Sequence, residues 1–171
     1  MKLILSSQIF GDVDATTNAF KEIKKDVSKL KILLIATPCL PFGPERDIVE
    51  LLEWGFKREN IIVFNPWEKD KFSNLDIDIV YVTGGNTFTG LKVIKDTSFD
   101  KDIINYVNNG VLYIGKSAGA HIATKNIEHI LEYDENEIGT HHFEGLGLMD
   151  GILVCHYSKD RQKTYERLLK E

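Results

Sequence analysis

Long hydrophobic runs are missing from this sequence of 171 residues. No run approaches the roughly 20 apolar residues of a membrane-spanning helix, and the apolar start at residues 1–5 meets serines too soon for a signal peptide. These absences predict a cytoplasmic protein without a membrane partner. The length suits a single domain, residues 1–171, and no repeat, linker or low-complexity stretch divides it.

Cysteine and basic charge are also scarce. The two cysteines, Cys39 and Cys155, form no close-spaced pair, so neither a disulfide nor a zinc pattern is present, and each is expected to be a small buried apolar residue. The net charge of −5, without a basic block, argues against a nucleic-acid partner. The pair His141-His142 has no flanking carboxylate motif, so we expect a solvated loop there rather than a metal site.

The chain does contain a series of short apolar runs that alternate with helical patterns. Continuous apolar runs of this length are typical of buried parallel strands, and they occur at residues 2–6, 31–37, 61–64, 78–83, 111–114 and 152–156. A turn with an N-cap at Gly11-Asp12 opens the first helical pattern, and a charged helix is expected over residues 158–171. The predicted fold class is α/β, a three-layer arrangement with a mostly parallel sheet and helices on both faces.

The fifth apolar run leads into Gly115-Lys116-Ser117-Ala118-Gly119 and then into a helical start. Strand, sharp turn with a serine at its apex, and helix form the layout of a nucleophile elbow. Small neighbours leave room for the backbone, the Ser117 hydroxyl would project above the sheet edge, and the Ala118 amide would face a developing oxyanion. The alternative is a tight strand-to-helix turn that only packs well.

A second glycine-rich turn, Gly84-Gly85-Asn86-Thr87, follows the strand expected at residues 78–83. Its amides could face an anion such as a carboxylate or an oxyanion. The turn is too short for a dinucleotide fingerprint and lacks the lysine of a phosphate-binding loop. An ordinary turn is the alternative, but two such turns at one sheet edge favour a shared pocket.

A serine nucleophile needs a base and a group that orients the base. His156 ends the strand expected at 152–156, at the same sheet edge as Ser117, which favours it over a merely structural histidine. His121, in the first turn of the elbow helix, is expected at most to line the site. The residues alone do not choose the acid among Glu128, Glu132, Asp134, Glu135, Glu137 and Asp160.

Taken in order, these motifs resemble the dipeptidase E and cyanophycinase family of serine peptidases. The resemblance extends from residue 1 to about 171 and is carried by Gly84-Gly85-Asn86-Thr87, Gly115-Lys116-Ser117-Ala118-Gly119-Ala120, Gly145-Leu146-Gly147-Leu148 and His156-Tyr157. It implies a flavodoxin-like, class I glutamine-amidotransferase-like fold. It also implies cleavage of dipeptides with an N-terminal aspartate through an acyl-enzyme, without a metal or cofactor.

Residue by residue, the resemblance implies Ser117 as the nucleophile and His156 as the base. Gly85 and Ala118 match the oxyanion-hole amides, and Asn86, in the same turn, is expected to bind substrate. The family acid falls at Asp134 when counted back from His156, although the match could shift to Glu132 or Glu135. Lys116, before the nucleophile, is unusual; such a cation could lower a neighbouring pKa or bind a carboxylate.

Family members usually continue well past the histidine, so the resemblance also implies a C-terminally shortened chain. The function that the resemblance implies is that of a serine peptidase acting on small peptides. Two alternatives stay open: an impaired member that binds a small molecule or a partner, and an esterase or amidase. The expected partner is a small peptide, and a homodimer is left open.

Overall fold

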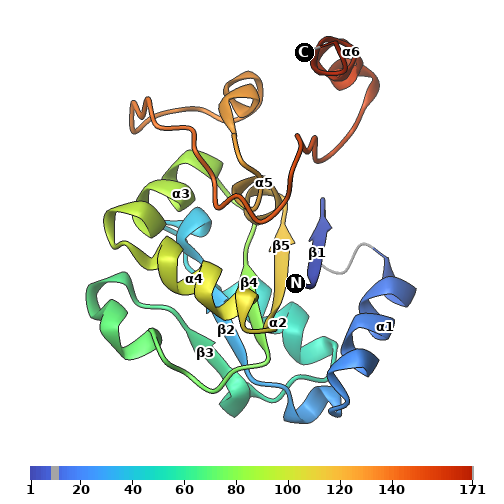
Figure 1. Ribbon diagram of the computed structural model, residues 1–171, viewed down its shortest axis with the longest axis vertical. Coiled ribbons are helices and arrows are strands. Elements are labelled where there is room, and N and C mark those ends of the chain that lie inside the picture. The colour runs from blue at the N-terminus through green and yellow to red at the C-terminus, as the bar shows by residue number, and fades with distance from the viewer. Residues whose placement is uncertain (9–11, 171) are drawn as a thin grey trace.

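The computed structural model describes residues 1–8 and 12–170. Five parallel strands form one sheet in the order β1-β5-β4-β2-β3 (Figure 1). The strands are β1 Leu3–Ser6, β2 Ile32–Ile35, β3 Ile61–Val63, β4 Ile79–Val82 and β5 Leu112–Lys116. The helices are α1 Val13–Ile23, α2 Glu45–Glu53, α3 Thr87–Asp96, α4 Phe99–Asn108, α5 Ala118–Ile122 and α6 Gln162–Leu168.

Alternating side chains along each strand cover the two faces of the sheet, as the pleat of a strand requires. Leu33 and Val80 contribute to one apolar cluster, which α3 and α4 cover. Leu34 and Ile79 contribute to a second cluster on the opposite face, which α1 and α2 cover. The three-layer α/β fold predicted from the sequence is confirmed. The expected N-cap is also present, because Asp12 accepts a hydrogen bond from the Ala15 amide at 2.8 Å, while Gly11 lies outside the described residues.

The parallel register brings the carboxyl ends of neighbouring strands to one edge of the sheet. Lys116 at the end of β5 pairs with Ser6 of β1, and Gly115 pairs with Val82 of β4. The residues that follow these strands therefore meet at this edge, where open α/β sheets place their ligands.

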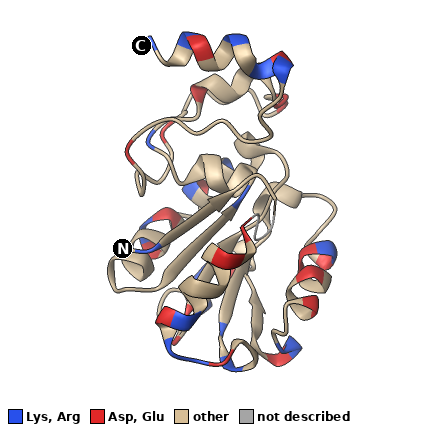
Figure 2. Cartoon of the chain, turned by 90° about the vertical axis from the view of Figure 1, so that its right-hand side faces the viewer, with Lys and Arg blue, Asp and Glu red and all other residues tan. Residues whose placement is uncertain are grey.

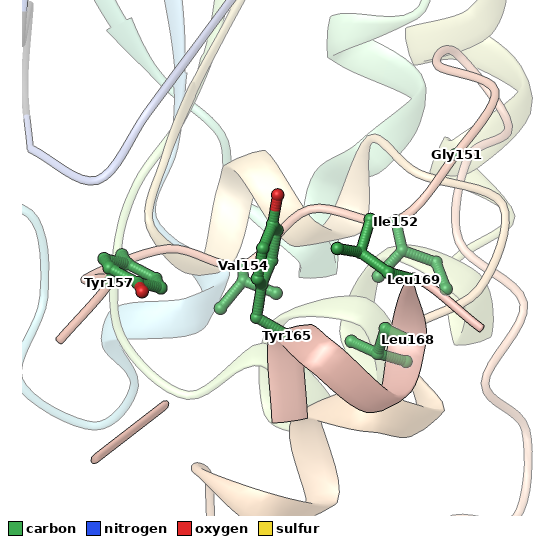
Figure 3. Close-up of a pocket in the computed structure, with 7 residues that line it drawn as sticks. All are labelled: Gly151, Ile152, Val154, Tyr157, Tyr165, Leu168 and Leu169. Carbon is green, nitrogen blue, oxygen red and sulfur yellow. The ribbon is translucent and has the colours of Figure 1, made fainter. Parts of the chain in front are cut away.

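The prediction of a sixth strand over residues 152–156 is wrong. This segment pairs with none of the described strands. Its apolar residues Ile152 and Val154 are not sheet core. Together with Tyr165, Leu168 and Leu169 they line an apolar groove of about 740 Å³ (Figure 3). The helix expected over 158–171 is shorter than predicted, a 3₁₀ turn followed by α6, and Glu171 lies outside the described residues.

Charged residues of both signs are interspersed over the helices and connecting turns, and the strands largely lack them (Figure 2). Within the described ranges, every helix is too short or too polar to cross a membrane.

Candidate active site

Ser117 stands between β5 and α5 with a strained backbone. Its φ of 49° and ψ of −106° place a non-glycine residue in a region that L-residues avoid. The Ser117 amide donates to the Ser6 carbonyl at 2.8 Å, which fixes the turn against β1. The strand, strained serine and short helix have the layout of a nucleophile elbow.

Close backbone packing explains the glycines around this turn. The Gly119 amide donates to the Thr83 carbonyl at 3.0 Å, and a Cβ on Gly119 would lie 2.1 Å from the Val82 carbonyl oxygen. The Tyr113 hydroxyl donates to the Gly119 carbonyl at 2.7 Å. The elbow therefore lies directly on the end of β4, and no larger residue fits at position 119.

The His156 imidazole reaches the nucleophile. Its Nε2 lies 2.8 Å from Ser117 Oγ, the distance of a hydrogen bond between a base and a hydroxyl. The His156 backbone has a φ of 53°, and its amide donates to Ser7 Oγ at 3.0 Å. The sequence thus indicated the residue that meets Ser117, although the strand expected to carry it is not formed.

The structure does not bring the expected acids to this pair. Asp134 accepts a hydrogen bond from the Thr87 amide at 2.9 Å, at the start of α3. Glu132 binds the Thr164 hydroxyl and Arg167, the latter at 2.6 Å. Within residues 1–8 and 12–170, no carboxylate hydrogen-bonds His156. The His156 imidazole is therefore oriented by its backbone and by Ser117 in this structure.

The turn Gly84-Gly85 lies beside the nucleophile. A Cβ on Gly84 would lie 3.4 Å from the Ser117 Cβ, and Gly85 has a φ of 131°. A Cβ on Gly85 would lie 2.0 Å from the Pro38 carbonyl oxygen, so only glycine fits there. The Gly85 and Ala118 amides have no hydrogen-bond partner in the described part of the chain.

Asn86 has a structural role beside its place in the cleft. Its Oδ1 accepts a hydrogen bond from the Thr89 amide at 2.9 Å and caps α3, and its Nδ2 donates to the Glu135 carbonyl at 2.8 Å. The Asn86 side chain therefore joins the start of α3 to the loop that carries Asp134.

A cleft of about 670 Å³ opens over these residues. Its walls come from the loop after β2, from α2, from the Gly84-Gly85 turn and from the elbow, and they include Ser117, His156, Asn86, Cys39, Phe42 and Arg46. The Cys39 thiol is half-buried, and burial raises its pKa. Cys155 is buried outside the cleft, and burial raises its pKa to about 11, as expected for an inert thiol.

A charge network that the sequence did not reveal forms one wall of this cleft. Lys116 Nζ lies 2.9 Å from Asp47 Oδ1 and 2.8 Å from Glu50 Oε2, and the Tyr81 hydroxyl donates to Asp47 at 2.8 Å. Desolvation lowers the pKa of Lys116, but the hydrogen bonds to Glu50 and Asp47 outweigh it and raise the pKa above its ordinary value. Lys116 therefore binds carboxylates of the protein itself, one of the two roles considered for this cation from the sequence. Asp47 and Glu50 lie three residues apart on α2 and so share a face of the helix, but this spacing does not identify Lys116 as their partner.

Two further histidines are buried behind the elbow. His121 and His129 are 5% and 7% exposed, and their rings meet edge to face with centroids 6.0 Å apart. Burial, followed by the charges of His129, Arg161 and His156, lowers the pKa of His121 to about 3, and burial also lowers the pKa of His129. His141 and His142 are exposed, and no cluster of three or more potential metal ligands occurs in the described ranges.

The fold and the elbow define an α/β protein with a serine–histidine pair at the carboxyl edge of its sheet. The chain belongs to peptidase family S51, whose family profile matches residues 46–171. Membership of this family confirms the resemblance found in the sequence motifs.

Curated relatives agree with this assignment. An uncharacterized peptidase of Listeria monocytogenes serovar 1/2a is 41% identical over 83 residues, 47% of this chain and 40% of the relative. Peptidase E of Citrobacter koseri is 38% identical over 101 residues, 56% of this chain and 43% of the relative. The matched segment thus spans less than half the length of these proteins.

Solved structures share the fold. A Listeria monocytogenes EGD-e protein assigned as a Peptidase E superposes with a TM-score of 0.77 at 26% identity, over 99% of this chain and 87% of the other. A peptidase from an acI-B1 Actinobacterium superposes with a TM-score of 0.64 at 14% identity, over 99% of this chain and 74% of the other, and supports the fold alone.

The contact between Gly85 and Pro38 can be tested by Gly85→Ala. The added Cβ must displace the Pro38 carbonyl and with it the turn beside Ser117, so acylation of Ser117 by a fluorophosphonate should slow by about 100-fold or more. Gly139→Ala is the matched control, because Gly139 also has a positive φ, of 60°, but nothing lies within 4 Å of its Cβ position. Equal rates for the two variants would contradict the close approach.

The buried imidazole of His121 predicts acid sensitivity of the fold. Between about pH 6.5 and pH 3, His121 is protonated in the unfolded chain but neutral in the folded chain. The contribution of the neutral ring to the free energy of unfolding is therefore complete above pH 6.5 and is lost as the pH falls. The loss from this residue approaches about 1.4 kcal/mol per pH unit, or about 2 kcal/mol at pH 5. Urea denaturation at several pH values between 7.5 and 5 measures the free energy of unfolding. This free energy should fall less steeply with decreasing pH in His121→Gln than in wild type. Identical slopes would contradict the assignment.

Proposed function

We propose that this protein is a serine peptidase that hydrolyses small peptides, in particular dipeptides with an N-terminal aspartate. The observation that carries the proposal is the 2.8 Å contact between Ser117 Oγ and His156 Nε2 on a strained elbow. Family membership and the name Peptidase E given to several relatives support the peptidase class. The narrower substrate class is what the resemblance of the sequence motifs implies.

The chemistry follows from the positions of the groups. His156 Nε2 takes the Ser117 proton while Oγ bonds to the scissile carbonyl carbon, whose oxygen becomes an oxyanion near the free Gly85 and Ala118 amides. Collapse breaks the C–N bond, and His156 returns the proton to the leaving amine. Water then attacks the acyl ester, His156 takes a proton from it, and the acid leaves as Ser117 is restored.

A second candidate is a binding protein that keeps the cleft but hydrolyses slowly. It is favoured because no carboxylate among residues 1–8 and 12–170 hydrogen-bonds His156, and loss of the orienting acid can reduce kcat by about 10⁴. A fluorophosphonate separates the candidates, because it acylates an activated Ser117 and leaves an inert serine unmodified.

The peptidase proposal predicts a difference between two substrate sets. Asp-X dipeptides should be hydrolysed at least about tenfold faster in kcat/KM than the matched Ala-X dipeptides, and Ser117→Ala should abolish both activities without unfolding the protein. Amine release measures turnover, and circular dichroism of the variant is the control. An esterase or amidase would turn over acyl esters or amides in preference to either set, and turnover retained in Ser117→Ala would refute the role of Ser117.

We further assign Arg46 as the cation that pairs with the aspartate side chain of the substrate. Lys116 is occupied by Asp47 and Glu50, whereas the Arg46 side chain is 84% exposed on the cleft wall with its Nε held by Glu50 at 3.2 Å. Arg46→Ala should raise KM for Asp-X dipeptides about 5- to 30-fold, the equivalent of about 1–2 kcal/mol, and leave Ala-X kinetics unchanged. A uniform loss for both sets would contradict this assignment.

A further inference from the structure

The segment that carries His156 receives its hydrogen bonds from side chains instead of from a neighbouring strand. The Leu153 carbonyl lies 2.8 Å from His129 Nε2, and the Cys155 amide donates to His121 Nε2 at 3.2 Å. The Cys155 carbonyl accepts from Arg161 at 2.5 Å. Buried backbone groups need such partners, so these side chains replace the strand that the sheet does not supply.

On its opposite side, this segment lines an apolar groove. Ile152 and Val154 face the groove formed with Tyr165 and Leu168 of the α6 region (Figure 3). Apolar contacts are not directional, so they do not prevent the segment from sliding along its own axis. The register of the segment therefore depends on the polar contacts of its inner side.

The inner contacts are tied to the nucleophile through one short helix. Ser117 immediately precedes α5, and the His121 amide donates to the Ser117 carbonyl at 3.1 Å, one turn later. The His121 imidazole then holds Cys155, the residue before His156. A single turn of helix thus connects both members of the serine–histidine pair.

The hydrogen bonds also define the proton positions on these rings. His121 accepts the Cys155 amide on Nε2, so a neutral His121 carries its proton on Nδ1, an atom that has no partner within the described residues. His129 contacts a carbonyl oxygen, so its Nε2 must donate. One ring is an acceptor and the other a donor, matching the amide and the carbonyl that they hold.

We propose that His121 and His129 are positioning residues that hold the backbone of residues 153–155 and thereby keep the His156 imidazole on the Ser117 hydroxyl. The consequence for reaction rate rests on the serine hydrolysis proposed above, whereas the consequence for the position of His156 does not. A displacement of about 1 Å of a catalytic group can cost about 10² in rate, so a small shift of the segment is sufficient to matter.

The test compares two substitutions of each ring. His121→Gln and His129→Gln keep a polar amide group near the position of Nε2, and His121→Leu and His129→Leu remove it. The exposed His141→Leu is the matched control. Acylation by a fluorophosphonate should slow about 10- to 100-fold in the leucine variants and recover to within about 3-fold of wild type in the glutamine variants. With the peptide substrates, the loss should fall on kcat and leave KM nearly unchanged.

A second measurement does not depend on activity. The ¹⁵N chemical shift of His156 Nε2 reports its hydrogen bond to Ser117, and Ser117→Ala gives the value without that bond. The leucine variants should move toward the Ser117→Ala value, and the glutamine variants should stay at the wild-type value. If His121→Leu does not fold, His121→Asn, whose amide is too short to reach Cys155, takes its place.

The outcomes separate the two proposals. A wild-type protein that resists acylation refutes the proposed hydrolysis, while the His156 shift in the variants still decides the positioning role. Leucine variants with wild-type acylation and a wild-type His156 signal overturn the positioning role. Equal losses in the leucine and glutamine variants, in step with their thermal stability, also overturn it, because they indicate packing alone.

Discussion

The packing of Gly119 against the end of β4 is the contact on which the site depends. With a hydrogen bond to Thr83 and no room for a Cβ beside Val82, the elbow helix is held directly on the strand that continues into Gly84-Gly85. Two turns from different parts of the sequence are thereby forced into contact, with Ser117 on one and the Gly85 amide on the other. The strained backbone of Ser117 persists because it is held on both sides: the Ser117 amide donates to the Ser6 carbonyl, and Gly119 is packed on the end of β4.

The sequence predicted the sheet and the elbow well, because both leave local patterns. Parallel strands buried on both faces are continuous apolar runs, and the small residues around Ser117 are required by the approach of two backbones. The segment 152–156 has the same apolar pattern as a strand, and periodicity does not reveal whether a partner strand lies beside it. His156 was therefore indicated for a reason that the structure does not bear out.

Other parts of the site depend on contacts between residues distant in sequence. Asp134 is the acid that counting back from His156 selects, yet its carboxylate accepts a hydrogen bond from the Thr87 amide at the start of α3. The ion pairs of Lys116 require α2 to pack over the end of β5, and the roles of His121 and His129 require the path of residues 153–155. None of these partners has a fixed sequence spacing, so no motif could have identified them.

The approach of Gly85 to Pro38 joins the wall of the cleft to the Gly85 amide, the proposed oxyanion donor. The Pro38 carbonyl also accepts the Asn86 amide at 2.8 Å, so the loop after β2 is bonded directly to the glycine turn. For the proposed hydrolysis, a substrate too large for the cleft would push this wall outward and carry the Gly85 amide away from the reacting carbonyl. Oversized substrates would then lose more in kcat than in affinity. They would bind in the cleft and be hydrolysed slowly.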